Sequence, residues 1–549
     1  MRCARVRPHS PLRRAAPYAQ QAGGKKLGKG EGGITPRSED FSAWYLDLIR
    51  VAELADYGPV RGTMVIRPYG YALWEGIQSF LDARFKETGH KNAYFPSFIP
   101  YSFIAKEADH VEGFAPELAL VTQGGGKELE EPLVVRPTSE TVVNHMFSQW
   151  VSSYRDLPLL VNQWANVVRW EMRTRPFVRT LEFLWQEGHT AHATQEEAEA
   201  ETLQMLEVYR ELAEGVLAMP VICGRKSRIE KFAGADHTYT IEAMMGDRKA
   251  LQAGTSHNLG QNFAKAFGTQ FQDEEGEQRH VWQTSWGVST RMVGGLIMTH
   301  GDDAGLRLPP AIAPTQVVVI PIWQKEKQRE AMVEAAERVT RDLKAAGVRV
   351  ELDASDKERP GWKFNQYEMR GVPVRIELGP RDVEKEAVVV ARRDRPGKEG
   401  KTFGVSWEAD SLVAHVRGLF DDIQAQMLVD AKAFREENIE DVTSMEELKA
   451  AVGAGKWARC AWDGSDEQEK ALKVREAEAC CLPACLADSA PFCRRRQAPP
   501  CAASRSSSRR AAASVWRQAR RALRLPSLPR CVMAIWSTCR PGFPLANEL

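Results

Sequence analysis

Apolar residues recur at helical spacing in two long segments of the first 310 residues. "WEGIQSFLDARFKETG" (74–89) and the segment 196–217 each place apolar side chains on one face, which predicts two amphipathic helices. "VWQTSWGVSTRMVGGLIMTHGD" (281–302) predicts a strand, a turn and a helix that begins at Arg291. "NAYFPSFIP" (92–100) predicts a strand that ends in proline. The pattern therefore mixes helices and strands, as in an α+β domain.

The pattern changes after "LPPAIAP" (308–314), a proline-rich joint. Four apolar runs, separated by helical segments, predict a compact α/β domain over residues 315–420. These runs are "TQVVVIPIW", "VRVELDA", "VPVRIELG" and "EAVVVARR". We therefore predict one domain over 34–310, the α/β domain over 315–420, and a charged, helical small domain over 421–474.

Composition excludes some classes of protein and leaves others open. Among 549 residues, 74 basic and 73 acidic side chains leave a formal charge of +1, so a nucleic acid would have to meet a local patch. No run approaches eighteen consecutive apolar residues, which argues against a membrane span and a membrane partner. Only Cys3 and Cys223 of the ten cysteines precede residue 460, which favours a reducing compartment over a disulfide scaffold.

The two ends of the chain differ from its middle. Residues 1–33 form a basic leader: eight Lys or Arg occur before the first acid, Glu31, which is typical of a transit peptide to a plastid or mitochondrion. A disordered tail on a cytoplasmic protein is the alternative. Residues 475–549 form an Arg/Cys-rich tail, with twelve arginines, no lysine and one acid from Ser489 onward. Either a disordered basic tail or a misread end of the gene explains that shift.

The stretch "RWEMRTRPFVRTLEFLWQEGH" (169–189) predicts a hairpin with a cationic loop at "TRP". Alternation places Arg169 and Glu171 on one face of the first strand. On the second strand it gives a common face to four residues, namely Phe183, Trp185, Glu187 and His189. A solvated surface hairpin would show the same alternation.

Three further segments carry candidate chemistry. "RPTSET" puts Thr138 and Glu140 on one face, although a helix cap explains this sequence equally well. "QAGTSHNLGQNF" puts Gln252, Gly254 and Ser256 on one side of a strand and Thr255 and His257 on the other. Arg291 begins a helix, where its cation and the free backbone N–H groups suit an anion; a structural salt bridge is the alternative.

These segments, with "THGDDAGLRLPP" (299–310), together resemble the prolyl-tRNA synthetase family of class II aminoacyl-tRNA synthetases, in its archaeal and eukaryotic form. The resemblance implies an α/β and α+β multidomain protein: an antiparallel sheet with flanking helices, then an α/β anticodon-binding domain. It implies a homodimer with an interface built by residues 74–100. Only 95 residues separate His189 from Ser285, too few for the editing domain that bacterial members insert.

The implied activity joins L-proline to tRNA(Pro) in two steps: ATP-dependent formation of prolyl-adenylate with release of pyrophosphate, then transfer to the 3′-terminal adenosine. Fixed guanidinium groups stabilise the charge that accumulates at phosphorus. The implied catalytic residues are Arg169, Glu171 and Arg291. ATP, with Mg²⁺ on its phosphates, is implied at Arg169, Glu171, Arg179, Thr180, Phe183, Gln252, Thr255 and Arg291. Proline is implied at Phe114, Glu117, Thr138, Glu140, Arg169, Trp185, Glu187, His189, His257 and Ser285.

The segment 360–382 resembles part of the family's anticodon-binding domain. Candidates for anticodon contacts there are Lys363, Arg375, Glu377 and Arg381; a solvated charged edge is the alternative. The cysteine spacing in "CCLPACLADSAPFC" does not suit a tetrahedral thiolate site, so no structural zinc is expected. A catalytically inactive, tRNA-binding paralogue is the rival function, and loss of Arg169, Glu171 or Arg291 would have favoured it. A synthetase for another small amino acid such as threonine is disfavoured by Trp185 and His189.

Overall fold

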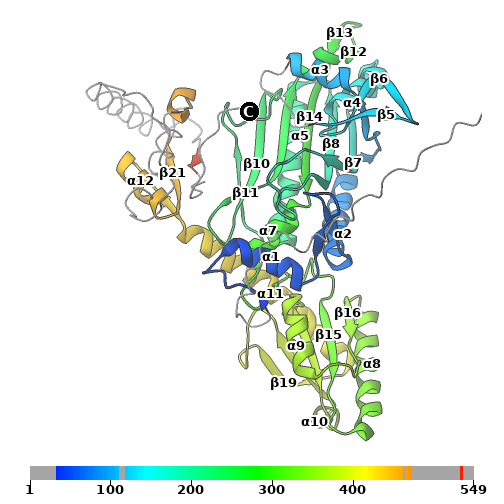
Figure 1. Cartoon of the computed structure of the whole chain (residues 1–549), viewed down its shortest axis with the longest axis vertical. Coiled ribbons are helices and arrows are strands. Elements are labelled where there is room, and N and C mark those ends of the chain that lie inside the picture. Colours follow the sequence, from blue (N-terminus) through cyan, green and yellow to red (C-terminus); the bar gives the residue numbers. More distant parts are fainter. Residues whose placement is uncertain (1–32, 111–117, 462–463, 471–531, 536–549) are drawn as a thin grey trace, which may run out of the picture.

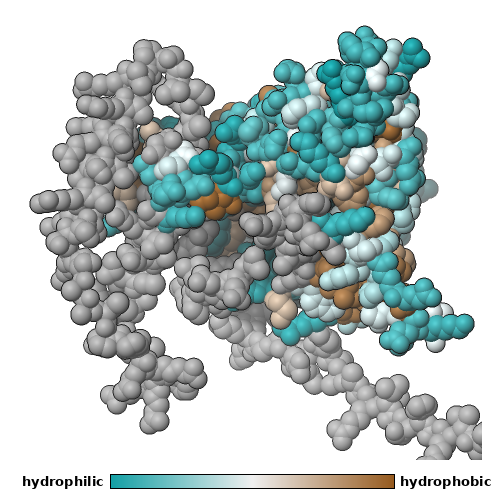
Figure 2. Space-filling model, turned by 90° about the horizontal axis from the view of Figure 1, so that it is seen from above, coloured by the Kyte–Doolittle hydropathy of each residue, from teal (hydrophilic) through white to brown (hydrophobic). Residues whose placement is uncertain are grey.

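The computed structural model describes residues 33–110, 118–461, 464–470 and 532–535 (Figure 1). A large sheet with its helices occupies one end of the long axis, an α/β unit the other end, and a small unit around α12 and β21 lies to one side (Figure 1). Within the described ranges no helix is long and apolar enough to cross a membrane. Among the residues that Figure 2 colours by hydropathy, the visible surface is mostly hydrophilic, with smaller hydrophobic areas.

A seven-stranded sheet forms the centre of the larger unit. Its order is β3-β7-β8-β14-β11-β10-β9, and every neighbouring pair except β3–β7 is antiparallel. The strands are β3 Lys91–Asn92, β7 Leu159–Val168, β8 Glu182–His192, β9 Val221–Arg225, β10 His237–Met244, β11 Ala250–Gly260 and β14 Trp282–Ser289. Helix α5 (Gln195–Glu211) covers one face: Tyr209 Oη donates to Gln186 Oε1 at 2.7 Å, and Ser256 Oγ donates to Thr202 O at 2.7 Å.

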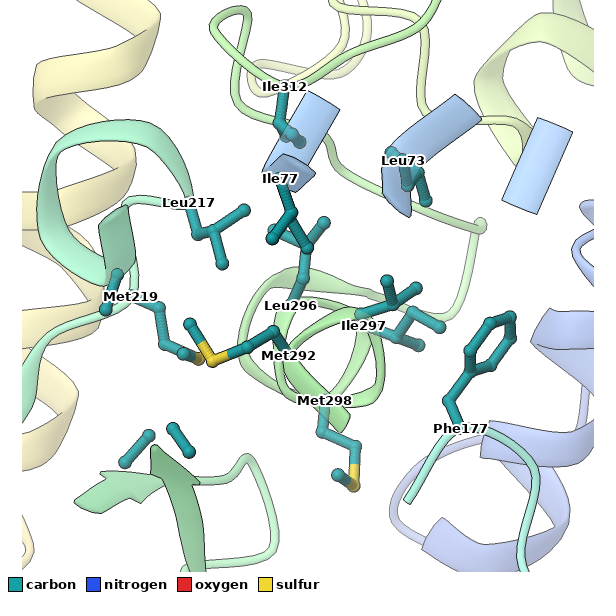
Figure 3. Packing of buried hydrophobic residues seen from close by; sticks show 14 of the residues in the cluster. Leu73, Ile77, Phe177, Leu217, Met219, Met292, Leu296, Ile297, Met298 and Ile312 are labelled. Atoms are coloured by element: carbon teal, nitrogen blue, oxygen red, sulfur yellow. The ribbon is translucent and has the colours of Figure 1, made fainter. Parts of the chain in front are cut away.

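Both predicted helices and the strand–turn–helix segment are confirmed. Helix α2 (Pro68–Glu87) ends just before Gly89, which has φ +90° and so takes a conformation that L side chains rarely adopt. Helix α7 (Arg291–His300) begins at Arg291 and packs its apolar residues into the main core, together with α1 (Phe41–Val51). Figure 3 shows Leu296 and Met292 of α7 in this cluster, with Ile77 of α2 nearby.

The predicted strand over 92–100 is mostly wrong. Only its ends pair, Asn92 in β3 and Phe98–Pro100 in β4, because Pro96 has no N–H for a ladder. The smaller elements of this unit are β1 Ala55–Tyr57, β2 Met64–Ile66, α3 Tyr101–His110, β5 Ala119–Gly124, β6 Lys127–Val135, α4 Glu140–Trp150, a 3₁₀ turn Tyr154–Asp156, a π-helical turn Leu212–Val216, α6 Asn262–Phe267, β12 Gln270–Gln272 and β13 Gln278–His280.

The α/β unit contains a five-stranded sheet of order β16-β15-β17-β18-β19. The four predicted strands are present, with β15 parallel to β16 and β17, while β17, β18 and β19 are antiparallel. The fifth, β19, was not predicted because its residues "KTFGVS" are largely exposed and include a glycine. The elements are β15 Val317–Pro321, a 3₁₀ turn Glu326–Gln328, α8 Arg329–Ala345, β16 Val350–Leu352, α9 Pro360–Met369, β17 Val374–Leu378, α10 Pro380–Val383, β18 Ala387–Arg392, β19 Lys401–Ser406 and α11 Ala409–Glu437.

The C-terminal part differs from the sequence-based expectation in two ways. Helix α11 runs through the predicted boundary at residue 420, so the chain has no break there. The segment predicted to be helical contains β20 (Ile439–Asp441), α12 (Met445–Gly453) and β21 (Trp457–Ala461). Of the tail beyond 474 only 532–535 are described, and they form strand β22 (Val532–Ile535), antiparallel to β21. The rest of this tail lies outside the described residues, so the expectation for it stays a prediction.

An ion pair between buried Arg393 and half-buried Asp302 joins the α/β unit to the larger unit. Arg393 donates to Asp302 through both terminal nitrogens, at 2.9 and 2.6 Å, and through Nε to Glu368 O at 2.9 Å. Trp44 Nε1 donates to Asp302 O at 3.0 Å, so the same residue also contacts α1. The two parallel bonds fix both the distance and the orientation of the two units.

We expect Asp302→Ala to lower the free energy of unfolding by about 2 kcal/mol, because the buried Arg393 guanidinium would lose its carboxylate. Urea unfolding measures the loss. Glu326→Ala is the control: it breaks an exposed pair with Arg329 (3.2 Å) and should change stability by less than about 0.5 kcal/mol. Equal losses in the two variants would contradict the role given to the Arg393–Asp302 pair.

Candidate active site

The strand register gathers predicted site residues on the face of the central sheet that α5 does not cover. Ser285 of β14 lies opposite His189 of β8 on one side and opposite His257 of β11 on the other. Paired residues in an antiparallel ladder share a face, and residues two apart along a strand share it too. The predicted common face of Phe183, Trp185, Glu187 and His189 is thus confirmed.

A β-bulge corrects the predicted face of Gln252. Ile241 pairs with Gly254 but Glu242 pairs with Gln252, so Ala253 has no partner and the alternation slips by one residue. Thr240 pairs with Thr255, and its hydroxyl donates to Glu242 Oε1 at 3.0 Å, so these residues share a face. Gln252 therefore lies on the same face as Thr255. The prediction from simple alternation, which placed these two residues on opposite faces, is wrong. Ser256 does lie on the far face, against α5.

The loop between β7 and β8 is longer than predicted. Strand β7 ends at Val168, so Arg169 and Glu171 belong to a loop over residues 169–181 rather than to a strand. The loop is still ordered by local bonds: Arg169 N donates to Leu181 O at 2.8 Å, and the Thr180 hydroxyl donates to Glu182 O at 2.8 Å. The prediction that Arg169 and Glu171 share one face of a strand is wrong, because the sequence alone does not show where the β7 ladder ends.

Two arginines of this loop, Arg169 and Arg179, lie close enough to Arg291 of α7 for their charges to act on it. Arg169 Nε donates to Pro137 O at 3.0 Å, and its guanidinium lies 5.6 Å from the ring centroids of both Phe183 and Trp185. Arg291 Nε donates to Val178 O at 3.1 Å. Burial, then the positive charges of Arg169 and Arg179, lower the pKa of Arg291. The guanidinium groups thus repel one another, and a bound anion would relieve that repulsion.

Carboxylates lie at the edge of this cationic cluster. Glu171 Oε1 is 3.6 Å from Arg179 Nε. Burial lowers the pKa of Arg169 while Glu140, Glu187 and Glu171 raise it, so three carboxylates act on that guanidinium. Thr138 and Glu140, which were predicted to share a face, contact each other: the Thr138 hydroxyl donates to the Glu140 carboxylate. Glu140 is the first residue of α4, but the side chain of Ser139, the N-cap residue, makes no capping hydrogen bond and donates to Glu187 instead, so the helix-cap alternative does not account for these side chains.

A buried ion pair forms the floor of the site. His189 Nε2 lies 3.1 Å from Glu187 Oε2, and Gln163 Nε2 donates to Glu187 Oε1 at 2.6 Å. The Ser139 hydroxyl also donates to Glu187. Burial alone would raise the pKa of Glu187, but these partners outweigh it and lower that pKa, while the pKa of His189 is raised by the carboxylate in spite of burial. Both shifts favour the ionised form of the pair, with a negative charge on Glu187 and a positive charge on His189.

His257 is half-buried and contacts no carboxylate among the described residues. Its Nδ1 lies 3.0 Å from the Thr238 hydroxyl, and its ring centroid lies 4.8 Å from that of Phe232. Burial, then the charges of Lys226 and His189, lower its pKa to about 3, so the imidazole is neutral at working pH. On the same face, Ser285 Oγ and Trp185 Nε1 are buried and find no hydrogen-bond partner among the described residues. Such groups suit a polar ligand.

Comparisons with known proteins identify this arrangement. Residues 121–300 match the tRNA synthetase class II core domain (G, H, P, S and T), and residues 316–411 match the anticodon binding domain. The chain is 65% identical to the chloroplastic/mitochondrial proline–tRNA ligase of Arabidopsis thaliana over 476 residues, 86% of this chain and 88% of that protein. It is 59% identical to the proline–tRNA ligase of Chlorobium luteolum over 440 residues, 80% of this chain and 90% of the relative.

A solved structure agrees. Prolyl-tRNA synthetase from Cryptosporidium parvum, complexed with halofuginone and AMPPNP, matches with a TM-score of 0.76 at 40% identity, covering 81% of this chain and 89% of that one. The chain belongs to the proline–tRNA ligase family. Its fold is that of a class II synthetase core followed by an anticodon-binding domain, as the sequence predicts, and its activity is that of an aminoacyl-tRNA synthetase.

In the anticodon-binding unit of this proline–tRNA ligase family member, three of the four predicted tRNA residues are engaged inside the protein. Lys363 Nζ pairs with Asp353 Oδ1 at 2.8 Å and donates to Asp353 O at 3.0 Å. Arg375 pairs with Glu377 (3.0 Å) and Glu368 (2.9 Å), and Lys401 Nζ donates to Glu377 at 2.7 Å. Arg381 is exposed on α10. Direct contacts by the buried three would need these pairs to open, and all four contacts stay predictions.

Two predicted site residues are not described by the structure, and three residues that contact the site were not predicted from the sequence. Phe114 and Glu117, predicted for the proline pocket, lie outside the described residues. The sequence-based prediction omitted Gln163, Lys226 and Glu242, which contact predicted site residues. Glu242 pairs with the predicted residue Gln252 across β10 and β11, and this register is not visible in the sequence. Gln163 and Lys226 belong to no recognisable motif.

Proposed function

We propose that this chain joins L-proline to tRNA(Pro) by way of prolyl-adenylate, with the residues described above in specific roles. One observation supports this proposal: Arg169, Arg179 and Arg291 lie beside the buried Glu187–His189 pair at one face of the sheet. Proline has an acid and an amine, and ATP has a polyanion. A site with concentrated positive charge next to carboxylates matches both ligands.

In the first step a carboxylate oxygen of proline attacks the α-phosphorus of ATP, and pyrophosphate leaves with the electrons of the broken P–O bond. Arg169 spans the attacking carboxylate and the α-phosphate, while Arg179 and Arg291 hold the distal phosphates. Glu171, Thr180, Gln252 and Thr255 hold the nucleotide, and the Phe183 ring offers a stacking face. No proton needs to be removed, because the carboxylate is already ionised. In the second step the ribose hydroxyl of the terminal adenosine attacks the acyl carbon, AMP leaves with the electrons of the broken C–O bond, and the hydroxyl proton passes to the departing phosphate.

The secondary ammonium of proline needs an anion or an oxygen acceptor. Glu140 and the Thr138 hydroxyl supply these groups, both buried. Trp185, His189, His257 and Ser285 wall the ring, and Glu187 fixes the orientation of His189 through their 3.1 Å bond. Because a small apolar pocket separates ligands by only about 1 to 3 kcal/mol per methylene, we expect alanine to enter as a weak substrate.

Mg²⁺ is the metal that we propose with ATP. The Glu242 carboxylate, paired with Gln252 across β10 and β11, is an oxygen donor of the kind that Mg²⁺ prefers, while the Gln252 amide oxygen accepts from Lys226 Nζ. Bound there, the ion would neutralise phosphate charge. Among the described residues no group of three or more His, Cys, Asp or Glu side chains could hold a metal by protein ligands alone.

The test is proline-dependent exchange of labelled pyrophosphate into ATP by the purified full chain, run beside threonine and alanine. We expect fast exchange with proline, slow exchange with alanine and none with threonine. No exchange with any amino acid would favour the inactive paralogue, and faster exchange with threonine would reassign the substrate. The residues whose loss would have favoured that paralogue, Arg169, Glu171 and Arg291, are all present.

We also propose a homodimer. Large apolar side chains are exposed around the segment that the family resemblance assigns to the interface: Tyr94 is 73% exposed, Phe98 52% and Tyr101 44%. A second copy would cover them. Sedimentation of the wild type and of Phe98→Asp tests this: we expect a dimer that weakens in the variant, and a monomeric wild type would refute it.

We propose a plastid or mitochondrial location for the chain. The Arabidopsis relative is named chloroplastic/mitochondrial, and the first 33 residues are basic and acid-poor, although residues 1–32 lie outside the described ranges. Residues 1–40 fused to a fluorescent protein should direct it to an organelle. A diffuse cytoplasmic signal would favour the disordered-tail alternative.

A further inference from the structure

A tight turn in the β7–β8 loop presents Arg179 and Thr180, two residues of the proposed ATP site. Arg175 N donates to Arg179 O at 2.6 Å and Arg179 N donates to Arg175 O at 2.9 Å, so the two ends of the turn are bonded to each other. Between them, Val178 N donates to Pro176 O at 2.8 Å. Phe177, at the centre, has φ +61°, in the left-handed region that a bulky residue rarely adopts.

The turn is held from two sides. On one side Arg291 Nε donates to Val178 O at 3.1 Å. On the other, Tyr45 Oη of helix α1 donates to Pro176 O at 2.8 Å. That carbonyl therefore accepts two hydrogen bonds, which uses both of its lone pairs. Phe177 anchors the turn: its side chain is 2% exposed and lies in the same cluster as Ile297 and Met298 of α7 (Figure 3).

The position of Tyr45 in helix α1 keeps its hydroxyl on the Pro176 carbonyl. Helix α1 is capped by Asp40, whose carboxylate accepts from the backbone N–H groups of Ser42 and Ala43, and Tyr45 lies on its buried face with no exposed surface. The Arg175 guanidinium lies 4.5 Å from the centre of the Tyr45 ring. Burial raises the pKa of the Tyr45 hydroxyl, so it remains a donor at working pH. The turn also packs directly on α7: a Cβ at Gly294 would lie 3.0 Å from Tyr45 Oη and 2.9 Å from Val178.

We propose that Tyr45, some 120 residues before the loop, is a positioning residue for ATP: its hydroxyl holds the strained turn that aims Arg179 and Thr180 at the nucleotide. Without the hydroxyl the Phe177 backbone can relax toward ordinary φ values. Arg179 and Thr180 follow the turn directly and would move with it. Arg169 lies at the other end of the loop, bonded to Pro137 O and Leu181 O, and should keep its place. The proposal rests on the proposed function for its ligand, ATP.

The test compares Tyr45→Phe with Tyr209→Phe in the full chain. Tyr209 is equally buried and also donates one hydrogen bond, at 2.7 Å to Gln186, but on the far face of the sheet. In pyrophosphate exchange we expect Tyr45→Phe to raise KM for ATP about tenfold while KM for proline changes less than twofold. Tyr209→Phe should leave both KM values within twofold. Equal KM values for ATP in the two variants would overturn the proposal.

Hydrogen–deuterium exchange tests the turn itself, without substrate. In Tyr45→Phe the amides of residues 174–180 should exchange at least tenfold faster, while those of β10 stay unchanged. In Tyr209→Phe residues 174–180 should match the wild type. Unchanged exchange at 174–180 in Tyr45→Phe would refute the positioning role. Because this readout needs no activity, it separates a failure of this inference from a failure of the proposed function.

Discussion

Arg169→Ala is expected to lower kcat/KM for proline-dependent pyrophosphate exchange by about 10²- to 10³-fold while the chain stays folded. Removing one fixed donor from a charge-stabilising site typically costs about 10²- to 10³-fold. Arg169 is placed to contact both reactants, since it lies over Phe183 and Trp185 and within the influence of Glu140. The loss should fall on kcat as well as on KM, because the charge at phosphorus is greatest in the transition state.

Arg173→Ala is the matched control for Arg169→Ala. It removes an exposed arginine from the same loop, and we expect exchange within threefold of the wild type. Binding of tRNA by the Arg169 variant should be nearly unchanged, since the anticodon-binding unit is untouched. An Arg169→Ala enzyme with more than a tenth of wild-type exchange would remove Arg169 from the proposed role.

Glu187→Gln is expected to have the largest effect on stability, a loss of about 3 kcal/mol near pH 6. The substitution keeps the shape of the side chain but removes the charge that pairs with His189, and both residues are buried. KM for proline should rise more than KM for ATP, because His189 would lose its fixed orientation. Urea unfolding and exchange kinetics measure the two effects. Glu182→Gln, on the same strand but exposed, should change neither, and a similar loss there would contradict the assignment.

The stability that the Glu187–His189 pair contributes should fall at low pH and also at high pH. The lowered pKa of Glu187 contributes stability above its ordinary value of about 4.5, and that contribution is lost as pH falls through the folded pKa. The raised pKa of His189 contributes fully below its ordinary value of about 6.5 and is lost as pH rises through the folded pKa. The difference in unfolding free energy between wild type and Glu187→Gln should therefore be greatest between about pH 4.5 and 6.5. A flat difference from pH 4 to 9 would contradict an ionised pair.

The sequence predicted those parts of the site that depend on local alternation. Phe183, Trp185, Glu187 and His189 share a face because β8 is regular over its whole length. Gln252 was assigned to the wrong face because the bulge at Ala253 depends on the pairing with β10, which alternation within one strand does not report. The ion pairs of Lys363 with Asp353 and of Arg375 with Glu368 were missed because these partners lie outside the helix or strand that carries the cation. The pair of Arg375 with Glu377 lies within β17, and alternation could have found it. Family resemblance supplied the ligands, which no periodicity could.

Because β8, β11 and β14 present their site residues on one face, the protein should tolerate insertions and deletions at some positions and not at others. Deleting one residue from the middle of β8 would turn His189 toward α5 and bring Gly188 to the ligand side, exchanging the two faces beyond the cut. Such a deletion should abolish activity even where each neighbouring substitution is mild. The turn between β12 (Gln270–Gln272) and β13 (Gln278–His280) joins strands outside this sheet, so insertions there should be accepted. Length variation within this enzyme family is thus expected at such hairpins and not in the three strands that carry the site.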